Sequence, residues 1–308
     1  MTRFGDFRPL CTSTPSYPWC NLFYTQLLRH APASLTGASA DQASAPIGVD
    51  PTCGALRLGH SGSLGNVANI VACAVSILFT ALLVVLTSRR AAAVGRVELR
   101  YFQILYLLTL PFQLVSTGAF LEQGSTALTV VTAIHAGLVA ALFWALLANA
   151  IVATQVVEDG TLSSLIPFHF FTLAFFAATT YIALDTAFMY THTFGPSAPP
   201  EALHGTALFV LTSIWPAAAA ILYFALMLYI VLGILNEVRP VWYFILAATV
   251  FVLSQLDYFL LNKVICRGSN TRVDGSFVAT ILETAAVGIL YLAWKSITED
   301  SWDDAYYE

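Results

Sequence analysis

The sequence has few charged residues for its length. Only 10% of its 308 residues are Asp, Glu, Lys or Arg, whereas 58% are hydrophobic and the mean hydropathy is +0.75. A soluble globular protein carries about 25% charged residues, so this chain has too few charges to cover an ordinary water-exposed surface. The abundance of apolar residues also excludes intrinsic disorder over most of the chain. A polytopic membrane protein is the class that remains.

Enzyme motifs and basic patches are missing as well. The 13 Lys and Arg residues are outnumbered by 18 Asp and Glu residues, which argues against a nucleic-acid partner. The sequence has no P-loop, no glycine-rich dinucleotide motif and no zinc-type spacing of Cys or His. No lysine lies within a long apolar run, which argues against a retinal Schiff base. We therefore predict a protein that is not an enzyme, with no catalytic residues, no cofactor and no metal.

Seven long apolar runs are what the sequence does contain. Each has the roughly 20 residues that a helix needs to cross a bilayer, and none alternates as β-barrel strands do. The predicted fold is all-α: a luminal N-terminal segment (1–63), a bundle of seven transmembrane helices (64–294) and a short acidic cytosolic tail (295–308). A kink is expected at Trp215-Pro216. The predicted spans are about 64–87, 99–120, 127–153, 165–189, 207–235, 241–261 and 277–294.

The N-terminal segment contains a shorter apolar stretch. Residues 19–28 are compatible with an amphipathic helix that lies on the membrane surface. An ordered loop explains the same residues equally well.

Seven spans place the two termini on opposite sides of the membrane. With the N-terminus outside, the basic residues divide almost evenly, six cytosolic against seven luminal. The positive-inside rule gives most weight to charges beside the first span. Arg89, Arg90, Arg96 and Arg100 follow that span closely, whereas only Arg57 lies just before it. This pattern favours a luminal N-terminus and a cytosolic C-terminus.

The cysteines favour the same orientation. Cys11, Cys20, Cys53 and Cys266 all fall on the luminal side, whereas Cys73 lies within the first span and fits apolar packing. An even set on one side predicts two disulfides in an oxidising compartment. Three pairings are possible, and one that involves Cys266 would staple the N-terminal segment to the last luminal loop. The alternative is four free cytosolic thiols.

Three carboxylates lie within the predicted spans, where an ionisable group is a functional hypothesis by default. Asp185, Asp257 and Glu283 all fall towards the luminal ends of spans four, six and seven. One interpretation is a proton or cation path. We favour an intramembrane polar cluster of ion pairs and hydrogen bonds that locks these spans together, because the three acids share one layer. The basic residues of the same region are Lys263, Arg267 and Arg272.

The C-terminal tail, 296–308, contains five acidic and three aromatic residues and is too short to fold. It fits a solvated acidic end. A second hypothesis is a short linear motif that binds vesicle coat components.

Several short motifs lie outside the apolar runs, in an order that runs along nearly the whole chain. They are Phe4-Gly5-Asp6-Phe7 and Pro18-Trp19-Cys20; Val49-Asp50-Pro51-Thr52-Cys53; Arg90 with Ala93-Val94-Gly95-Arg96-Val97-Glu98; Glu158-Asp159-Gly160-Thr161; Val273-Asp274-Gly275-Ser276-Phe277-Val278-Ala279-Thr280; and Trp294-Lys295-Ser296-Ile297-Thr298.

Together these motifs resemble the fungal chitin synthase export chaperone family. The resemblance implies a multi-pass protein of the endoplasmic reticulum membrane. Such a protein binds a chitin synthase as a transmembrane client and supports its folding and its export towards the cell surface. Membrane lipid is the other expected partner. The absence of an active-site constellation is compatible with this role.

Two other functions fit a seven-helix chain. A receptor would need cytosolic loops that couple to a partner, but the predicted loops have only about 4–11 residues, and the Asp-Arg-Tyr and Asn-Pro-x-x-Tyr motifs are missing. A small-solute or proton transporter would be expected to show internal repeats, and none is evident.

Overall fold

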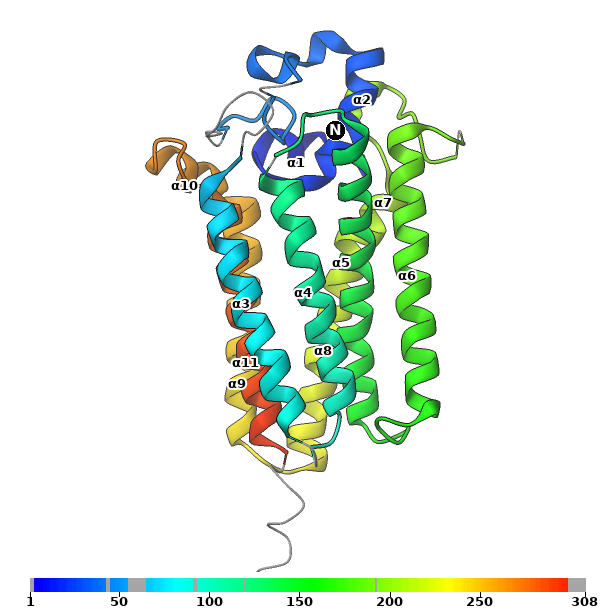
Figure 1. Cartoon of the computed structure of the whole chain (residues 1–308), viewed down its shortest axis with the longest axis vertical. Coiled ribbons are helices and arrows are strands. Elements are labelled where there is room, and N and C mark those ends of the chain that lie inside the picture. The colour runs from blue at the N-terminus through cyan, green and yellow to red at the C-terminus, as the bar shows by residue number, and fades with distance from the viewer. Residues whose placement is uncertain are drawn as a thin grey trace, which may run out of the picture.

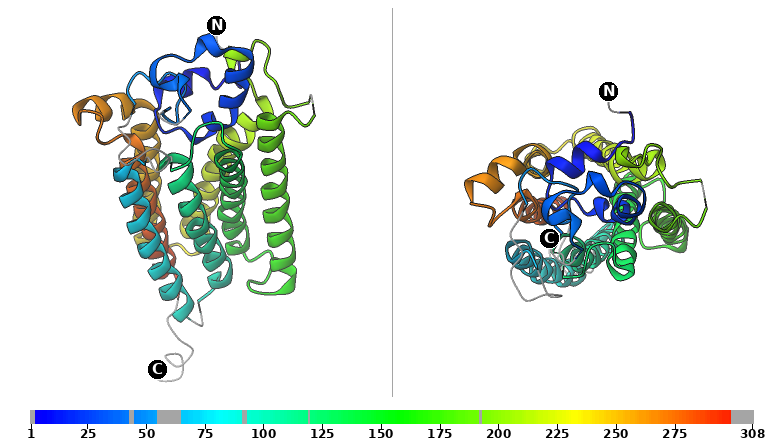
Figure 2. Two further views of the ribbon diagram at one scale, coloured as in Figure 1. Left: turned by 45° about the horizontal axis from the view of Figure 1, so that its top comes forward. Right: turned by 90° about the horizontal axis from the view of Figure 1, so that it is seen from above.

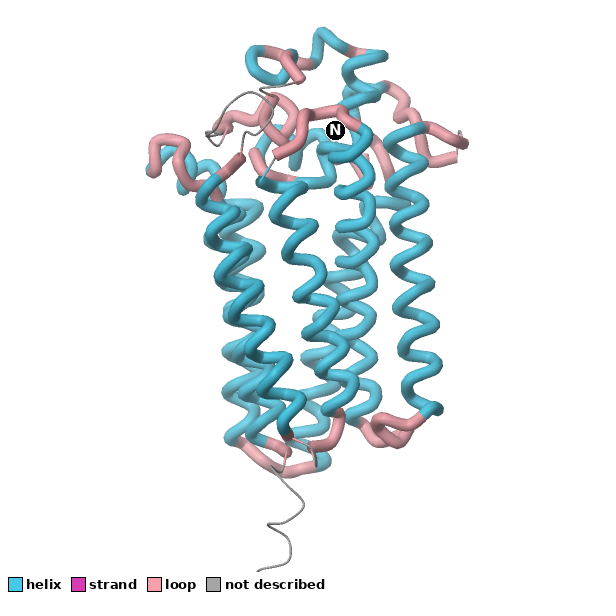
Figure 3. Tube along the Cα trace, in the orientation of Figure 1, coloured by secondary structure: helices cyan, strands magenta, loops and turns pink. Residues whose placement is uncertain are grey.

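A computed structural model of the chain describes residues 3–42, 45–54, 65–90, 93–118, 120–191 and 193–298. Across these ranges the chain is helical, and the β-structure is limited to one isolated bridge between Asp6 and His204. The long helices run side by side in one bundle (Figures 1 and 3). Residues 3–42 and 45–54, which we call the cap, cover one end of this bundle, and the last helix finishes at the other, remote end.

Within the described ranges, six helical segments are long and apolar enough to cross a membrane, which supports the predicted class of polytopic helical membrane protein. They coincide with six of the seven predicted runs, although the predicted run 241–261 continues as helix to Gly268. These segments are α3 (Val67–Arg89), α5 (Thr126–Ala153), α6 (Leu162–Phe188), Thr206–Ile234, Arg239–Gly268 and α11 (Gly275–Ser296).

The helix α4 (Arg96–Gly118) coincides with the remaining predicted run. It has 23 residues and lies in the bundle between α3 and α5 (Figure 1). It is not among the six segments above, and its first turns carry Arg96, Glu98 and Arg100.

Two of the six segments are built from several helical pieces. Thr206–Ile234 comprises α7 (Thr206–Phe209), η5 (Val210–Ile214), α8 (Trp215–Tyr229) and η6 (Ile230–Ile234). Arg239–Gly268 comprises α9 (Arg239–Leu256), η7 (Asp257–Leu261) and α10 (Asn262–Gly268).

The kink predicted at Trp215-Pro216 corresponds to the π-helical turn η5, which ends just before this pair. Proline has no N–H to donate and crowds the preceding turn of an α-helix, so a local change of helix type accommodates it. The indole Nε1–H of Trp215 donates to the carbonyl of Ala140 at 3.0 Å, which ties this point to α5.

The cap consists of short helices: α1 (Arg8–Ser13), η1 (Pro18–Cys20), α2 (Asn21–His30), η2 (Pro32–Ser34) and η3 (Gly37–Ala40). Of the two alternatives for residues 19–28, the structure shows a helix rather than a loop. This helix, α2, is part of the protein interior and not a free surface helix. It packs against α5 and α6, with Leu22, Phe23 and Leu27 fully buried.

The helix α5 lies at the centre of the bundle. It packs against α4, α6 and α8, and 67% of its most apolar stretch is buried, compared with 11% for α6. Gly137 allows α6 to approach it closely, because a Cβ atom at this position would lie 2.7 Å from the carbonyl oxygen of Phe176. Small residues serve the same purpose in other membrane helix pairs.

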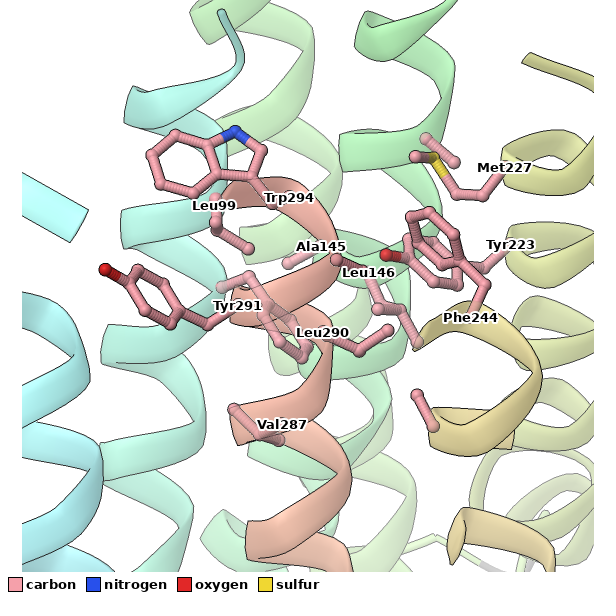
Figure 4. Packing of buried hydrophobic residues seen from close by; sticks show 14 of the residues in the cluster. Leu99, Ala145, Leu146, Tyr223, Met227, Phe244, Val287, Leu290, Tyr291 and Trp294 are labelled. Carbon is pink, nitrogen blue, oxygen red and sulfur yellow. The ribbon is translucent and has the colours of Figure 1, made fainter. Parts of the chain in front are cut away.

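Two apolar cores lie within the described part of the protein. The first occupies the remote half, where side chains of α11 point towards neighbouring helices (Figure 4). The second lies under the cap and joins it to α5, α6 and the 203–208 region. Members of the first core include Leu99, Tyr223, Phe244, Leu290 and Trp294; members of the second include Phe7, Trp19, Phe23, Ala136 and Ala183.

Candidate functional site

Loop motifs that are far apart in sequence meet at the remote end of the bundle. Glu98, in the first turn of α4, is fully buried. Its Oε1 accepts hydrogen bonds from the backbone N–H of Gly160 at 2.9 Å and from the hydroxyl of Ser164 at 3.0 Å. One carboxylate therefore ties α4 to the loop before α6 and to the first turn of α6.

A second bond joins the same two loops in the opposite direction. The backbone N–H of Gly95 donates to Oδ2 of Asp159 at 2.9 Å. Each loop thus contributes one glycine N–H and one carboxylate, Gly95 with Glu98 and Asp159 with Gly160. Both glycines have positive φ, +70° and +67°, a conformation that glycine adopts without steric cost.

The end of α11 joins this arrangement through Trp294. Its indole N–H donates to the carbonyl of Val94 at 2.8 Å. The guanidinium of Arg90 lies 5.9 Å from the centre of the same ring and donates to the carbonyl of Thr298 at 2.8 Å. We call the resulting set the loop clasp; its members are Arg90, Gly95, Glu98, Asp159, Gly160 and Trp294.

Two other residues predicted with these loops are not members of the loop clasp. Arg96 is partly exposed and reaches the carbonyl of Ser88 at 3.5 Å, and Glu158 is exposed.

Two disulfides hold the cap. Cys11 pairs with Cys20 within the cap, and Cys53 pairs with Cys266 of α10, across 213 residues of sequence. Cys73 is buried in α3 as a free thiol. The structure therefore selects one of the three possible pairings, and that pairing staples the N-terminal segment to α10, the helix before α11.

The first motif of the chain binds the loop before α7. Phe7 N–H donates to the carbonyl of Leu203 at 3.1 Å, and Gly205 N–H donates to that of Gly5 at 3.0 Å. The carboxylate of Asp6 lies 2.8 Å from Nδ1 of His204. Desolvation acts to raise the pKa of Asp6, but the bond from the Arg3 backbone N–H and the contact with His204 outweigh it, so the pKa lies below its ordinary value.

Asp274 is the polar centre of the cap end. It directly precedes α11 and is fully buried. Its carboxylate accepts hydrogen bonds from the hydroxyls of Ser16, in the cap, and Ser276, in α11, and from the amide of Asn66 at the start of α3. Ser16 and Asn66 were not predicted as partners, because they lie 258 and 208 residues from Asp274 and no local pattern marks them.

Gly275 is required by close packing against η7. A Cβ atom here would lie 2.6 Å from the carbonyl oxygen of Asp257 and 3.0 Å from the amide nitrogen of Asn262. We expect Gly275→Ala to destabilise the protein by about 1–3 kcal/mol, as other overpacked sites do. Thermal unfolding in detergent measures this effect. Gly268→Ala is the matched control, since nothing lies within 4 Å of its added Cβ; equal stability of the two variants would contradict the packing argument.

The three predicted intramembrane carboxylates do not form one cluster. Glu283 Oε1 accepts from Nε2 of Gln255 at 2.9 Å, which joins α11 to α9. Asp185 accepts from the backbone N–H and the hydroxyl of Thr191, just beyond the end of α6. Asp257 lies in η7. The expectation of a single cluster was wrong because α6 stands on the opposite side of the bundle from α9 and α11 (Figures 1 and 2).

The expected ion pairs of this layer are not formed either. Within the described residues, no ion pair joins Lys263, Arg267 or Arg272 to Asp257 or Glu283. The reason is the course of α10, which extends outwards from the bundle (Figure 1) and contains Lys263 and Arg267.

Two predictions concern residues that lie wholly or partly outside the described ranges. Of the tail 296–308, for which a motif for coat components was predicted, residues 299–308 lie outside them, as does Arg57. Within the described ranges, no group of three or more His, Cys, Asp or Glu residues is arranged to hold a metal ion.

The fold and these contacts define a polytopic helical membrane protein whose loop motifs serve to join its helices at both ends. Comparison with known proteins then gives its family. The chain belongs to the chitin synthase export chaperone family, whose profile matches residues 3–306. This confirms the family that the loop motifs predicted.

Curated relatives support the assignment over nearly the whole chain. A chitin synthase export chaperone of Gibberella zeae is 26% identical over 301 residues, which cover 97% of this chain and 84% of the relative. One of Aspergillus oryzae is 27% identical, with 96% and 83% covered, and one of Neurospora crassa is 25% identical, with 97% and 78% covered. Family membership supports a chaperone role in chitin synthase export, implies a chitin synthase client, and is consistent with a chain that is not an enzyme.

Proposed function

We propose that this chain is a chaperone of the endoplasmic reticulum membrane that binds a chitin synthase and supports its folding and its export towards the cell surface. The observation that carries the proposal is the family match over residues 3–306. The architecture supports it, because most described residues lie in the bundle and the loop motifs serve to tie helices together. A rigid helical body of this kind suits a protein that shields poorly packed transmembrane surface of a client.

We further propose that α4 is a seventh span and that the cap faces the lumen. The support for α4 as a span is its position, since it packs between α3 and α5. Two of its interior polar side chains also bond to neighbouring helices: Gln103 accepts from Thr87 of α3 at 2.8 Å, and Gln113 donates to Thr280 of α11 at 2.7 Å. Both disulfides lie at the cap end, which suits an oxidising lumen.

The outward face of α6 is the surface that we propose for the client. This helix packs chiefly against α5 and α2, and its most apolar stretch is the least buried of the six segments. Leu173 and Phe170 are 65% and 64% exposed on it. A client span could therefore pack along α6 without displacing another helix of the bundle.

Co-purification tests both the function and the surface. The tagged chain is purified in mild detergent from the native fungus after placing a photo-crosslinking residue at position 173 or, as a control, at Leu78, an exposed residue of α3. We expect a chitin synthase to co-purify in both cases and to crosslink from position 173 only. Crosslinking from position 78 alone would refute the α6 surface. A chitin synthase that never co-purifies would refute client binding itself.

A further inference from the structure

A cavity of about 420 Å³ lies inside the bundle, between the two apolar cores. Its walls come from α4, α5, α8, α9, η7 and α11, with residues of η5 beside them. Its volume lies within the range of roughly 300–1,000 Å³ that small-molecule sites occupy. Neither the loop clasp nor the client surface proposed above uses this cavity.

The cap closes the cavity at its own end. Tyr17, Pro18 and Trp19 belong to the lining, and the Cys11–Cys20 disulfide restrains the loop that carries them. The Tyr258 hydroxyl donates to the carbonyl of Ser16 at 2.9 Å and fixes the same loop from η7. The cavity is therefore a preformed site whose cap end is covalently restrained, so ligand binding would cost little conformational entropy in the protein.

Phenylalanine rings from five different elements are among the aromatic groups that line the cavity. The face of an aromatic ring attracts a cation, and the attraction strengthens when water is excluded. The walls therefore suit an apolar body and also favour a positive charge. These rings belong to Phe102 of α4, Phe143 of α5, Phe224 of α8, Phe251 of α9 and Phe259 of η7.

Within the described residues, Glu283 is the one carboxylate in the lining, and no lysine or arginine lines the cavity. Its hydrogen-bond donor is the neutral amide of Gln255, at 2.9 Å. His135 also lines the cavity, but its Nδ1 is hydrogen-bonded to the Ser116 hydroxyl at 2.8 Å. An ionised carboxylate in apolar surroundings is costly unless a positive charge pairs with it, so a cation bound in the cavity would stabilise the ionised form of Glu283.

We propose that this cavity binds a protonated amine carried on an apolar body, with the ammonium group at Glu283 and the body against the aromatic walls. The proposal concerns a ligand of the bundle interior and does not depend on the chaperone function. The same chemistry is found in two sources, a long-chain amine dissolved in the membrane and a small amine dissolved in water.

Binding is measured on the full chain purified into phosphatidylcholine nanodiscs. Dodecylamine and dodecanol form a matched pair, because they share one apolar chain and differ in the head group. We expect saturable binding of dodecylamine, about tenfold or more tighter than that of dodecanol, since only the amine can pair with Glu283. Saturable binding of 2-phenylethylamine as well would indicate a water-soluble ligand, and its failure to bind would indicate a membrane amine. Equal binding of dodecylamine and dodecanol would overturn the proposal.

Variants locate the site. Glu283→Gln should weaken dodecylamine binding about tenfold or more and leave dodecanol binding unchanged. Asp257→Asn is the control, because Asp257 is a half-buried acid of the adjoining turn that does not line the cavity, and it should bind as the parent does. Unchanged dodecylamine affinity in Glu283→Gln would also overturn the proposal. If that variant fails to fold, the comparison of amine and alcohol on the parent chain decides alone.

Discussion

Cys266→Ser is expected to destabilise the purified protein by about 2–5 kcal/mol, the range typical for removal of a native disulfide. The Cys53–Cys266 bond closes a loop of 213 residues, and a long loop gains more from closure than a short one. It is also the covalent link between the cap and α10. Without it, the attachment of the cap near α11 rests on noncovalent bonds such as that from Ser16 to Asp274.

Thermal unfolding in detergent measures this loss. Because Cys53 and Cys266 form one bond, the double variant Cys53→Ser/Cys266→Ser should be no less stable than Cys266→Ser alone. With reductant, the parent should be as unstable as the variant or less stable still, since reductant opens the Cys11–Cys20 bond as well as the Cys53–Cys266 bond. A parent that unfolds at the same temperature with and without reductant would show that the disulfides do not stabilise the fold.

Glu98→Ala should destabilise the protein by roughly 2–5 kcal/mol, because hydrogen bonds to a charged group are worth about 1.5–3 kcal/mol each. The substitution removes the acceptor for both the Gly160 N–H and the Ser164 hydroxyl. It also leaves a void at a position that is fully buried. The junction of α4 with the start of α6 should loosen as a result.

Two further variants separate this effect from a change of net charge. Glu158→Ala removes a carboxylate from the same loop pair, but Glu158 is exposed, so its stability should stay within about 0.5 kcal/mol of the parent. Glu98→Gln keeps one acceptor oxygen and should fall between the parent and Glu98→Ala. If Glu158→Ala destabilises as much as Glu98→Ala, the loss comes from charge and not from the buried hydrogen bonds.

The membrane architecture and the family were predictable because their signals are local. Apolar runs long enough to cross a bilayer mark helices directly, and the six candidate segments fall where such runs were expected. Motifs such as Gly95 to Glu98 and Asp159-Gly160 were noticed as short patterns. That these two loops bond to each other was not predicted, because a sequence does not show which loops face one another.

The predictions that were wrong have a common physical cause: the sequence does not give the lateral position of a helix within the bundle. Asp185, Asp257 and Glu283 were placed in one layer by counting along each span, but height in the membrane does not give the neighbours of a helix. The structure puts α6 far from α9 and α11, so Asp185 bonds locally to Thr191. The interpretation of residues 19–28 as a surface helix missed the packing for a related reason, because the sequence does not show that the apolar face of α2 packs on α5 and α6.

The proposed role in export of a chitin synthase is tested most directly by one measurement. This is the fraction of a fluorescently tagged chitin synthase at the plasma membrane of the native fungus. The proposed function predicts that deleting this chain leaves the synthase in the endoplasmic reticulum. Re-expression of the parent chain should restore the surface fraction, whereas Glu98→Ala should restore it less well than Glu158→Ala does. An unchanged surface fraction in the deletion strain would contradict the chaperone function.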